Sequence, residues 1–277
     1  LLWGNGADDM LFAAFLAVRE NNHAFALSLA PSYFDYSTYS QAAGLGIRFM
    51  DFLPGFDFDE KEYVKVLNSD NCRLGILCNP NNPTGHLISD EKILYALNNT
   101  RKPVLLDETY FEFSGITWVD RIKDFSNLLI VRSFSKSFSA AGLRFGYIVS
   151  QPQNIVELRK VQTIFNTSIM VQTVVMTMLM NKDLFLRHTR EAVALKKSLY
   201  EEMQGIEGLK SYPSHTNFVT FSAGERSAAL FEHLKNNDIA IRDVGAHRLL
   251  KNCLRVSVGS LEQNRYFIDQ VKAFFAA

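Results

Sequence analysis

The sequence has no excess charge of either sign and few cysteines. Lys and Arg together number 29, as do Asp and Glu, so the net charge is zero. A nucleic-acid-binding surface needs a clustered basic excess, and the chain has no such cluster. Cys72, Cys78 and Cys253 lie far apart, which fits a reducing cytoplasmic compartment better than a disulfide framework. We therefore expect small molecules or a second subunit as partners.

Long hydrophobic runs are also absent. The longest apolar stretch, SIMVQTVVMTMLM at 168–180, is too short and too polar to span a bilayer, so we expect no membrane attachment. We interpret its methionines, at positions 170, 176, 178 and 180, as helix packing. The chain begins LLWGNG, without Met, and these residues resemble the end of a buried strand. We therefore expect a natural amino-terminal segment to be missing.

Motifs for hydrolytic and metal chemistry are missing as well. The sequence contains no Gly-x-Ser-x-Gly elbow and no His-Glu-x-x-His. The six histidines are scattered without the spacing of metal ligands. We therefore expect neither a serine hydrolase nor a metal site.

Apolar runs of strand length alternate with helix-like segments in the first half of the chain. With 47% hydrophobic and 21% charged residues, the composition is that of a globular protein with a sizeable core. Several runs lack strict polar alternation, which is typical of strands covered on both faces. This predicts an α/β fold with a mostly parallel sheet and helices on both sides. The runs span 25–30, 46–52, 73–78, 103–107, 127–134 and 143–150.

Three residues mark expected helix starts. Asp8 or Asp9 is placed to cap a helix that runs through Val18, and Ser89 is placed to open another. Pro152 begins a further helical stretch.

After about residue 150 the strands become few and short. A long amphipathic helix is predicted at 183–204, and shorter helices at about 226–236 and 262–275. Strands are expected at 217–221, 239–244 and 253–259. We predict a large domain at 1–180 and a smaller α+β domain at 181–277.

Polar residues follow the apolar runs. GILC leads to NPNNPTG (79–85), VLL leads to DETY (107–110), and LLIV leads to RSFSK (132–136). The first segment leads into GNGADD (4–9). Ligands of open α/β sheets bind at the carboxyl ends of the strands, so these four segments are expected to form one site.

Lys136 is the most informative single residue. A lysine is usually a solvated surface residue, which is the alternative interpretation. Against it, the hydroxyl of Ser133 and the guanidinium of Arg144 are suited to a phosphate, and a helix start at GNGADD adds backbone N–H groups. A lysine beside another cation in a desolvated pocket has a lowered pKa and is an amine nucleophile toward carbonyls.

Asp107, Tyr110 and Asn82 complete the pattern. Taken alone, Asp107 is equally typical of a helix cap or a solvated turn, and Asn82 of a connecting loop. Together with Lys136 they describe a site for pyridoxal phosphate, in which lysine holds the aldehyde as a Schiff base and an aspartate pairs with the ring nitrogen.

The ordered motifs NPNNPTG, DETYFEF and SFSKSFSAAGLRFGY resemble those of fold-type I aminotransferases. The pattern is most similar to the histidinol-phosphate aminotransferase group, from GNGADD through PSYFDY to CLRVSVG. The resemblance implies the three-layer fold of these enzymes, pyridoxal 5'-phosphate as cofactor, and a homodimer. It also implies transfer of an amino group between an amino acid or amino phosphate and a 2-oxo acid.

The resemblance also assigns roles to individual residues. Lys136 would carry the cofactor, Asp107 would pair with its ring nitrogen, and Tyr33 would stack on its ring. Tyr110 and Asn82 would bond the phenolic oxygen of the ring. The phosphate would be held by Gly6, Ala7, Asp8, Ser133 and Arg144.

Two arginines resemble substrate-binding residues of the group. Arg255 resembles the arginine that grips the substrate carboxylate, where a planar bidentate fork suits the anion. Arg242 resembles a second arginine that meets the substrate phosphate. For each of the two arginines, a plain surface charge is the alternative interpretation.

Two other functions share these motifs. An amino-acid-phosphate decarboxylase of the same fold uses the same cofactor residues, and a non-catalytic domain that senses pyridoxal phosphate would keep them too. The sequence does not separate these alternatives from transamination.

Overall fold

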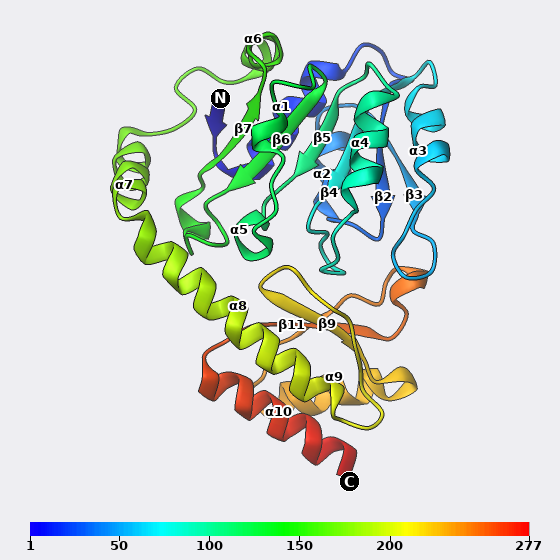
Figure 1. Cartoon of the computed structure of the whole chain (residues 1–277), viewed down its shortest axis with the longest axis vertical. Coiled ribbons are helices and arrows are strands. Elements are labelled where there is room, and N and C mark those ends of the chain that lie inside the picture. Colours follow the sequence, from blue (N-terminus) through cyan, green and yellow to red (C-terminus); the bar gives the residue numbers. More distant parts are fainter. Residues whose placement is uncertain (277) are drawn as a thin grey trace.

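Two β-sheets organise the molecule (Figure 1), and the computed structural model describes residues 1–276. The larger sheet has seven strands in the order β1-β7-β6-β5-β4-β2-β3. Only β7 runs against the others, because both of its neighbours pair with it antiparallel. The strands are β1 (Leu2–Gly4), β2 (Phe25–Ala30), β3 (Gly46–Asp51), β4 (Cys72–Cys78), β5 (Val104–Asp107), β6 (Leu128–Ser133) and β7 (Gly146–Ser150).

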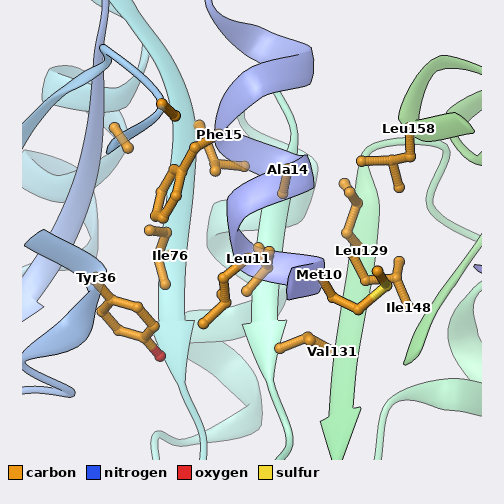
Figure 2. Packing of buried hydrophobic residues seen from close by; sticks show 14 of the residues in the cluster. Met10, Leu11, Ala14, Phe15, Tyr36, Ile76, Leu129, Val131, Ile148 and Leu158 are labelled. Carbon is orange, nitrogen blue, oxygen red and sulfur yellow. The ribbon is translucent and has the colours of Figure 1, made fainter. Parts of the chain in front are cut away.

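Helices cover both faces of this sheet, which confirms the predicted three-layer α/β architecture. One face is covered by α1 (Gly6–Val18), α2 (Asp35–Ala42) and α6 (Pro152–Val161). The other is covered by α3 (Glu60–Leu67) and α4 (Asp90–Asn98). Figure 2 shows α1 lying across the sheet, with Met10 and Leu11 directed at the strands. The central strands are apolar on both faces because each face packs against helices.

The smaller sheet is antiparallel, in the order β10-β11-β9-β8, and confirms the predicted α+β part. Its core is separate from the two cores of the larger sheet. The 180/181 boundary remains a prediction. The elements are β8 (Lys210–Ser211), β9 (Phe218–Ser222), β10 (Arg242–Asp243), β11 (Cys253–Ser257), α8 (Lys182–Gln204), α9 (Ser227–Asn236) and α10 (Leu261–Ala276).

Short helices and one bent connection complete the chain. The helix α7 (Ile169–Met180) precedes α8 with a bend of 72° between them. Among residues 1–276 no single helix is both long enough and apolar enough to cross a membrane. The bent pair of α7 and α8 reaches the required length and apolar composition only when the two helices are taken together. The short helices are α5 (Phe111–Ser114), η1 (Val119–Arg121), η2 (Ala141–Leu143), η3 (Gly224–Arg226) and η4 (Arg248–Leu250).

Several helix boundaries agree with the predictions and one does not. Ser89 is the N-cap residue of α4, and Pro152 occupies the first turn of α6. The prediction that Asp8 or Asp9 caps the first helix is wrong, because that helix already begins at Gly6 with Asn5 at the N-cap. Asp9 instead accepts a hydrogen bond from the Asn5 backbone N–H at 3.0 Å. An acid in the first turn of a helix can accept a hydrogen bond from the N-cap N–H, and in sequence such an acid looks the same as an acid at the N-cap itself.

The packing prediction for the methionines of α7 is confirmed for Met178 and wrong for the other three, which are exposed. Only Val175 is buried in this helix, while Met170 is 76% exposed and Met180 is 78% exposed. The helix contacts the rest of the chain along one side, where Val175 and Met178 meet the cluster around Phe134. Its remaining apolar surface faces outward.

Candidate active site

The polar segments that follow the strands meet in one cavity. It has a volume of about 170 Å³ and lies at the carboxyl ends of β4, β5 and β6, beside the start of α1. All the expected cofactor-binding residues except Gly6 line it. The lining residues are Ala7, Asp8, Leu11, Tyr33, Cys78, Asn82, Asp107, Thr109, Tyr110, Ser133, Ser135, Lys136, Ala141 and Arg144.

Lys136 presents its amine to this cavity. Its side chain is half-buried, and its Nζ lies 5.5 Å from the centre of the Tyr110 ring. No hydrogen bond or ion pair engages this Nζ within residues 1–276. Burial lowers the pKa of Lys136, and the nearby charge of Arg255 lowers it further. The site therefore favours the neutral, nucleophilic form of the amine.

Asp107 lies buried at the end of β5 with both carboxylate oxygens bonded. Its Oδ1 accepts from the Thr109 N–H at 3.0 Å and the Thr109 hydroxyl at 2.6 Å. Its Oδ2 accepts from the Tyr36 hydroxyl at 2.7 Å. Burial raises the pKa of Asp107, and these hydrogen bonds oppose the rise. Three hydrogen bonds therefore stabilise the charged form of this carboxylate inside a desolvated site.

The anion-binding end of the cavity is built where α1 begins. Arg144 pairs with Asp8 at 2.6 Å between Nη2 and Oδ2, and Ser133 and Ser135 line the cavity nearby. Gly6 lies behind Arg144, since a Cβ there would come within 2.6 Å of Arg144 Nη2. Backbone N–H groups at a helix start, hydroxyls and a guanidinium are the usual ligands of a phosphate.

The remaining predicted cofactor residues line the walls of the cavity. Tyr33 donates to Asp8 at 3.3 Å, and burial raises the pKa of its phenol. Tyr110 is buried with its ring edge-on to Phe218 at 5.6 Å. Asn82 accepts from Arg255 at 2.6 Å between Oδ1 and Nη1.

The two predicted substrate arginines lie on neighbouring strands. Arg255 of β11 lies opposite Arg242 of β10 in the antiparallel register. Arg255 reaches the rim of the cavity through Asn82, and burial lowers the pKa of its guanidinium. Arg242 is exposed and does not line the cavity.

The side chains of the cavity fit pyridoxal phosphate. Within the described residues the amine of Lys136 has no competing partner, and the buried carboxylate of Asp107 is suited to a ring nitrogen. The start of α1 with Arg144 is suited to the phosphate. Among residues 1–276, no cluster of His, Cys, Asp and Glu is suited to a metal ion.

Sequence reasoning missed the residues that support Asp107. Thr109 lies two positions after an aspartate, which is the spacing of a local Asx turn, so its signal was present. Tyr36 is 71 residues away on α2, and no local pattern points to it.

A buried ion pair lies behind the Lys136 loop and was also missed. Arg132 pairs with Glu108 at 2.8 Å, and Glu108 also accepts from Thr117. The nearby Glu112 has a buried Oε2 that finds no hydrogen-bond partner among residues 1–276, and burial raises the pKa of this acid to about 7.

Comparison with known proteins places this geometry in a family. The sequence profile described as Aminotransferase class I and II matches residues 1–271. The chain is 32% identical over 271 residues to histidinol-phosphate aminotransferase 1 of Carboxydothermus hydrogenoformans, covering 98% of this chain and 76% of that protein.

Solved structures agree with the profile on the fold. The histidinol-phosphate aminotransferase from Clostridium acetobutylicum superposes with a TM-score of 0.90 at 24% identity, covering 99% of this chain and 83% of that one. The histidinol-phosphate aminotransferase from Sinorhizobium meliloti in complex with pyridoxal-5'-phosphate gives a TM-score of 0.87 at 23% identity, with coverages of 99% and 76%.

Proposed function

Because the chain belongs to the class I and II aminotransferase family and is a pyridoxal-phosphate-dependent aminotransferase, we propose that Lys136 bears its cofactor. We also propose that the amino donor is a histidinol-phosphate-like amino phosphate or an amino acid. A 2-oxo acid is the acceptor. The observation that carries this proposal is the unpaired Lys136 amine in a cavity shared with Asp107 and with the phosphate ligands at the start of α1.

Each wall of the cavity would hold a different part of the cofactor. Ala7, Asp8, Ser133 and Arg144 would bind the phosphate, with Gly6 behind the guanidinium of Arg144. Tyr33 would stack on the ring, and Tyr110 and Asn82 would bond the phenolic oxygen. When bound, pyridoxal phosphate supplies an aldehyde that takes the amino nitrogen and a ring that withdraws electrons from the carbon being deprotonated.

The residues of the chain supply the proton chemistry. Asp107 would hold a proton on the ring nitrogen, because its carboxylate is fixed at the end of β5 by Thr109 and Tyr36. Once an incoming amine has displaced it from the cofactor, Lys136 Nζ would take the proton from the substrate α-carbon, since its lowered pKa favours the neutral, basic form of the amine.

Arg255 and Arg242 favour an anionic substrate. Arg255 would bind a carboxylate by exchanging its hydrogen bond with Asn82 for a bidentate one. Arg242, exposed opposite Arg255 on the adjacent strand, would meet a second anionic group such as a phosphate. The relative from C. hydrogenoformans carries the name of an enzyme for such an amino phosphate.

A homodimer is the assembly that we propose. The helix α7 is apolar on nearly all sides but buries only Val175 within the subunit. A helix that is hydrophobic all round is normally buried, so a second copy would cover it.

A cytoplasmic location is proposed as well, since Cys72, Cys78 and Cys253 are free and buried.

Reductive trapping tests the role of Lys136. After borohydride treatment of the cofactor-loaded protein, peptide mapping is expected to place the adduct on Lys136. Lys136→Ala should lower transamination at least a thousandfold and keep the far-UV circular dichroism. Lys196→Ala is the matched control, because Lys196 is also buried with a lowered pKa but lies on α8 outside the cavity. An adduct on another lysine would refute the proposal.

A panel of donors tests the reaction itself. Histidinol phosphate, aromatic amino acids and amino-acid phosphates would each be supplied with 2-oxoglutarate, and glutamate and carbon dioxide would be measured. Formation of glutamate with an amino phosphate supports the proposal. Stoichiometric carbon dioxide would establish the decarboxylase instead, and cofactor binding without any turnover would favour the sensor.

A further inference from the structure

We propose that Tyr36 is a positioning residue whose hydroxyl keeps the Asp107 carboxylate charged and oriented toward the cofactor ring. This inference rests on the proposed function, because it assumes that Asp107 meets the ring nitrogen. Tyr36 itself does not line the cavity, so it acts through Asp107.

The geometry assigns one donor set to each carboxylate oxygen. Thr109 supplies two donors to Oδ1 from the same loop, and Tyr36 supplies the one donor given to Oδ2 within residues 1–276. Because Thr109 lies only two positions after Asp107 in the sequence, it orients the acid only locally. Tyr36 comes from α2, across the sheet, and therefore fixes the carboxylate relative to the rest of the fold.

The environment of Tyr36 fixes its ring and keeps its hydroxyl protonated, so the hydroxyl remains a hydrogen-bond donor. Tyr36 is fully buried, and its ring packs edge-on to Tyr33 at 5.4 Å. Figure 2 shows its hydroxyl directed toward the carboxyl ends of the strands, beside β4. Burial raises the pKa of Tyr36 well above its ordinary value, and the charge of Asp107 adds to the rise. The hydroxyl therefore stays protonated and remains a donor over the working pH range.

The hydrogen bond matters because Asp107 is buried and its carboxylate is largely desolvated. Burial raises the pKa of this carboxyl, and the bonds from Thr109 and Tyr36 oppose that effect. A charge-assisted hydrogen bond in a desolvated site is stronger than a neutral one. Without the Tyr36 hydroxyl, a larger fraction of Asp107 would be protonated, and a neutral acid does not pair with a protonated ring nitrogen.

A second buried tyrosine offers a comparison for the hydroxyl of Tyr36. Tyr63 on α3 is also fully buried, but it donates to the backbone carbonyl of Ile76 at 3.3 Å and lies outside the cavity. Both residues bury a phenol against the same sheet from opposite faces. Tyr63 therefore provides a matched control for the loss of one buried hydroxyl.

The experiment compares Tyr36→Phe with Tyr63→Phe. The dissociation constant of pyridoxal phosphate would be measured by titrating the apo-protein, and visible absorbance would be recorded from pH 5 to pH 9. Tyr36→Phe is expected to weaken cofactor binding on the order of tenfold or more, to shift the pH midpoint of the visible band, and to lower kcat more than KM. Tyr63→Phe should change the dissociation constant, kcat and KM by less than twofold and should leave the pH midpoint where it is in wild type.

The same measurements in an Asp107→Asn background test whether Tyr36 acts through the acid. There, Tyr36→Phe is expected to have no further effect on cofactor binding. Equal cofactor affinity of Tyr36→Phe and Tyr63→Phe, or an undiminished loss in the Asp107→Asn background, would overturn the inference. If wild type binds cofactor on Lys136 but transfers no amino group, the proposed function fails while this comparison still holds.

Discussion

At the scale of single residues, the two buried acids Glu108 and Glu112 differ in how many hydrogen-bond partners they have. Glu108 is satisfied by Arg132, Thr117 and the Trp118 N–H. Glu112 faces Arg132, Glu108, Tyr147 and Ser137 but leaves its buried Oε2 without a partner. Arg132 forms its ion pair with Glu108, and protonation of Glu112 removes the charge that burial disfavours.

We predict that Glu112 makes stability fall as the pH rises. Its pKa is raised by burial from 4.5 to about 7 in the fold, so the native state binds more protons than the unfolded chain between these values. The free energy of unfolding should therefore fall by about 3 kcal/mol between pH 4 and pH 8 because of this residue. Glu112→Gln should remove that fall in urea titrations. The exposed Glu207→Gln is the control and should follow wild type; parallel curves for all three proteins would contradict the prediction.

At the scale of elements, the contact between α1 and β7 sets the position of the phosphate ligands. A Cβ on Gly146 would come within 2.3 Å of the Ala7 backbone nitrogen and the Gly6 carbonyl carbon. The first turn of α1 therefore lies directly on β7, which holds its N–H groups at the carboxyl end of β6. Gly146 is required by this close approach rather than by its backbone angles.

Gly146→Ala is accordingly predicted to displace the start of α1. We expect a loss of stability of about 2–4 kcal/mol in urea unfolding and at least tenfold weaker binding of pyridoxal phosphate. Gly142→Ala, where a Cβ would meet no atom within 4 Å, should change stability by less than about 1 kcal/mol. Wild-type stability in Gly146→Ala would show that the contact is not restrictive.

At the scale of the whole molecule, the outward apolar surface gathers on α7. Ile169, Met170, Val174 and Met180 are exposed there, and the preceding Phe165 is 97% exposed. Figure 1 shows α7 at the edge of the molecule, beside the large sheet and before the long helix α8. Monomeric proteins rarely expose so much contiguous apolar surface, which supports the proposed homodimer.

A charge placed on α7 should therefore weaken the dimer. Val174→Glu is expected to raise the dissociation constant of the dimer at least tenfold in sedimentation velocity, because the interface would bury an unpaired carboxylate. The control is Val156→Glu on α6, where an apolar side chain of similar exposure lies outside this surface. A monomeric wild type, or equal association of both variants, would argue against the α7 interface.

The sequence by itself predicted strands β2 to β7 of the larger sheet, several helix starts and the main polar residues that line the cavity. Apolar runs bounded by polar turns are local signals, and the carboxyl ends of parallel strands necessarily meet at one edge of a sheet. That is why Lys136, Asp107 and Asn82 were predicted to lie together from their places in the chain.

Only the tertiary structure decided what supports these residues and what remains uncovered. Tyr36 on α2 donates a hydrogen bond to Asp107 at the end of β5, and Glu112 is buried with its Oε2 unpaired among the described residues. Met170, Met176 and Met180 of α7 face outward although the sequence of this helix is that of a core helix. Burial, desolvation and long-range hydrogen bonds depend on which elements pack together, and no local pattern of residues encodes that choice.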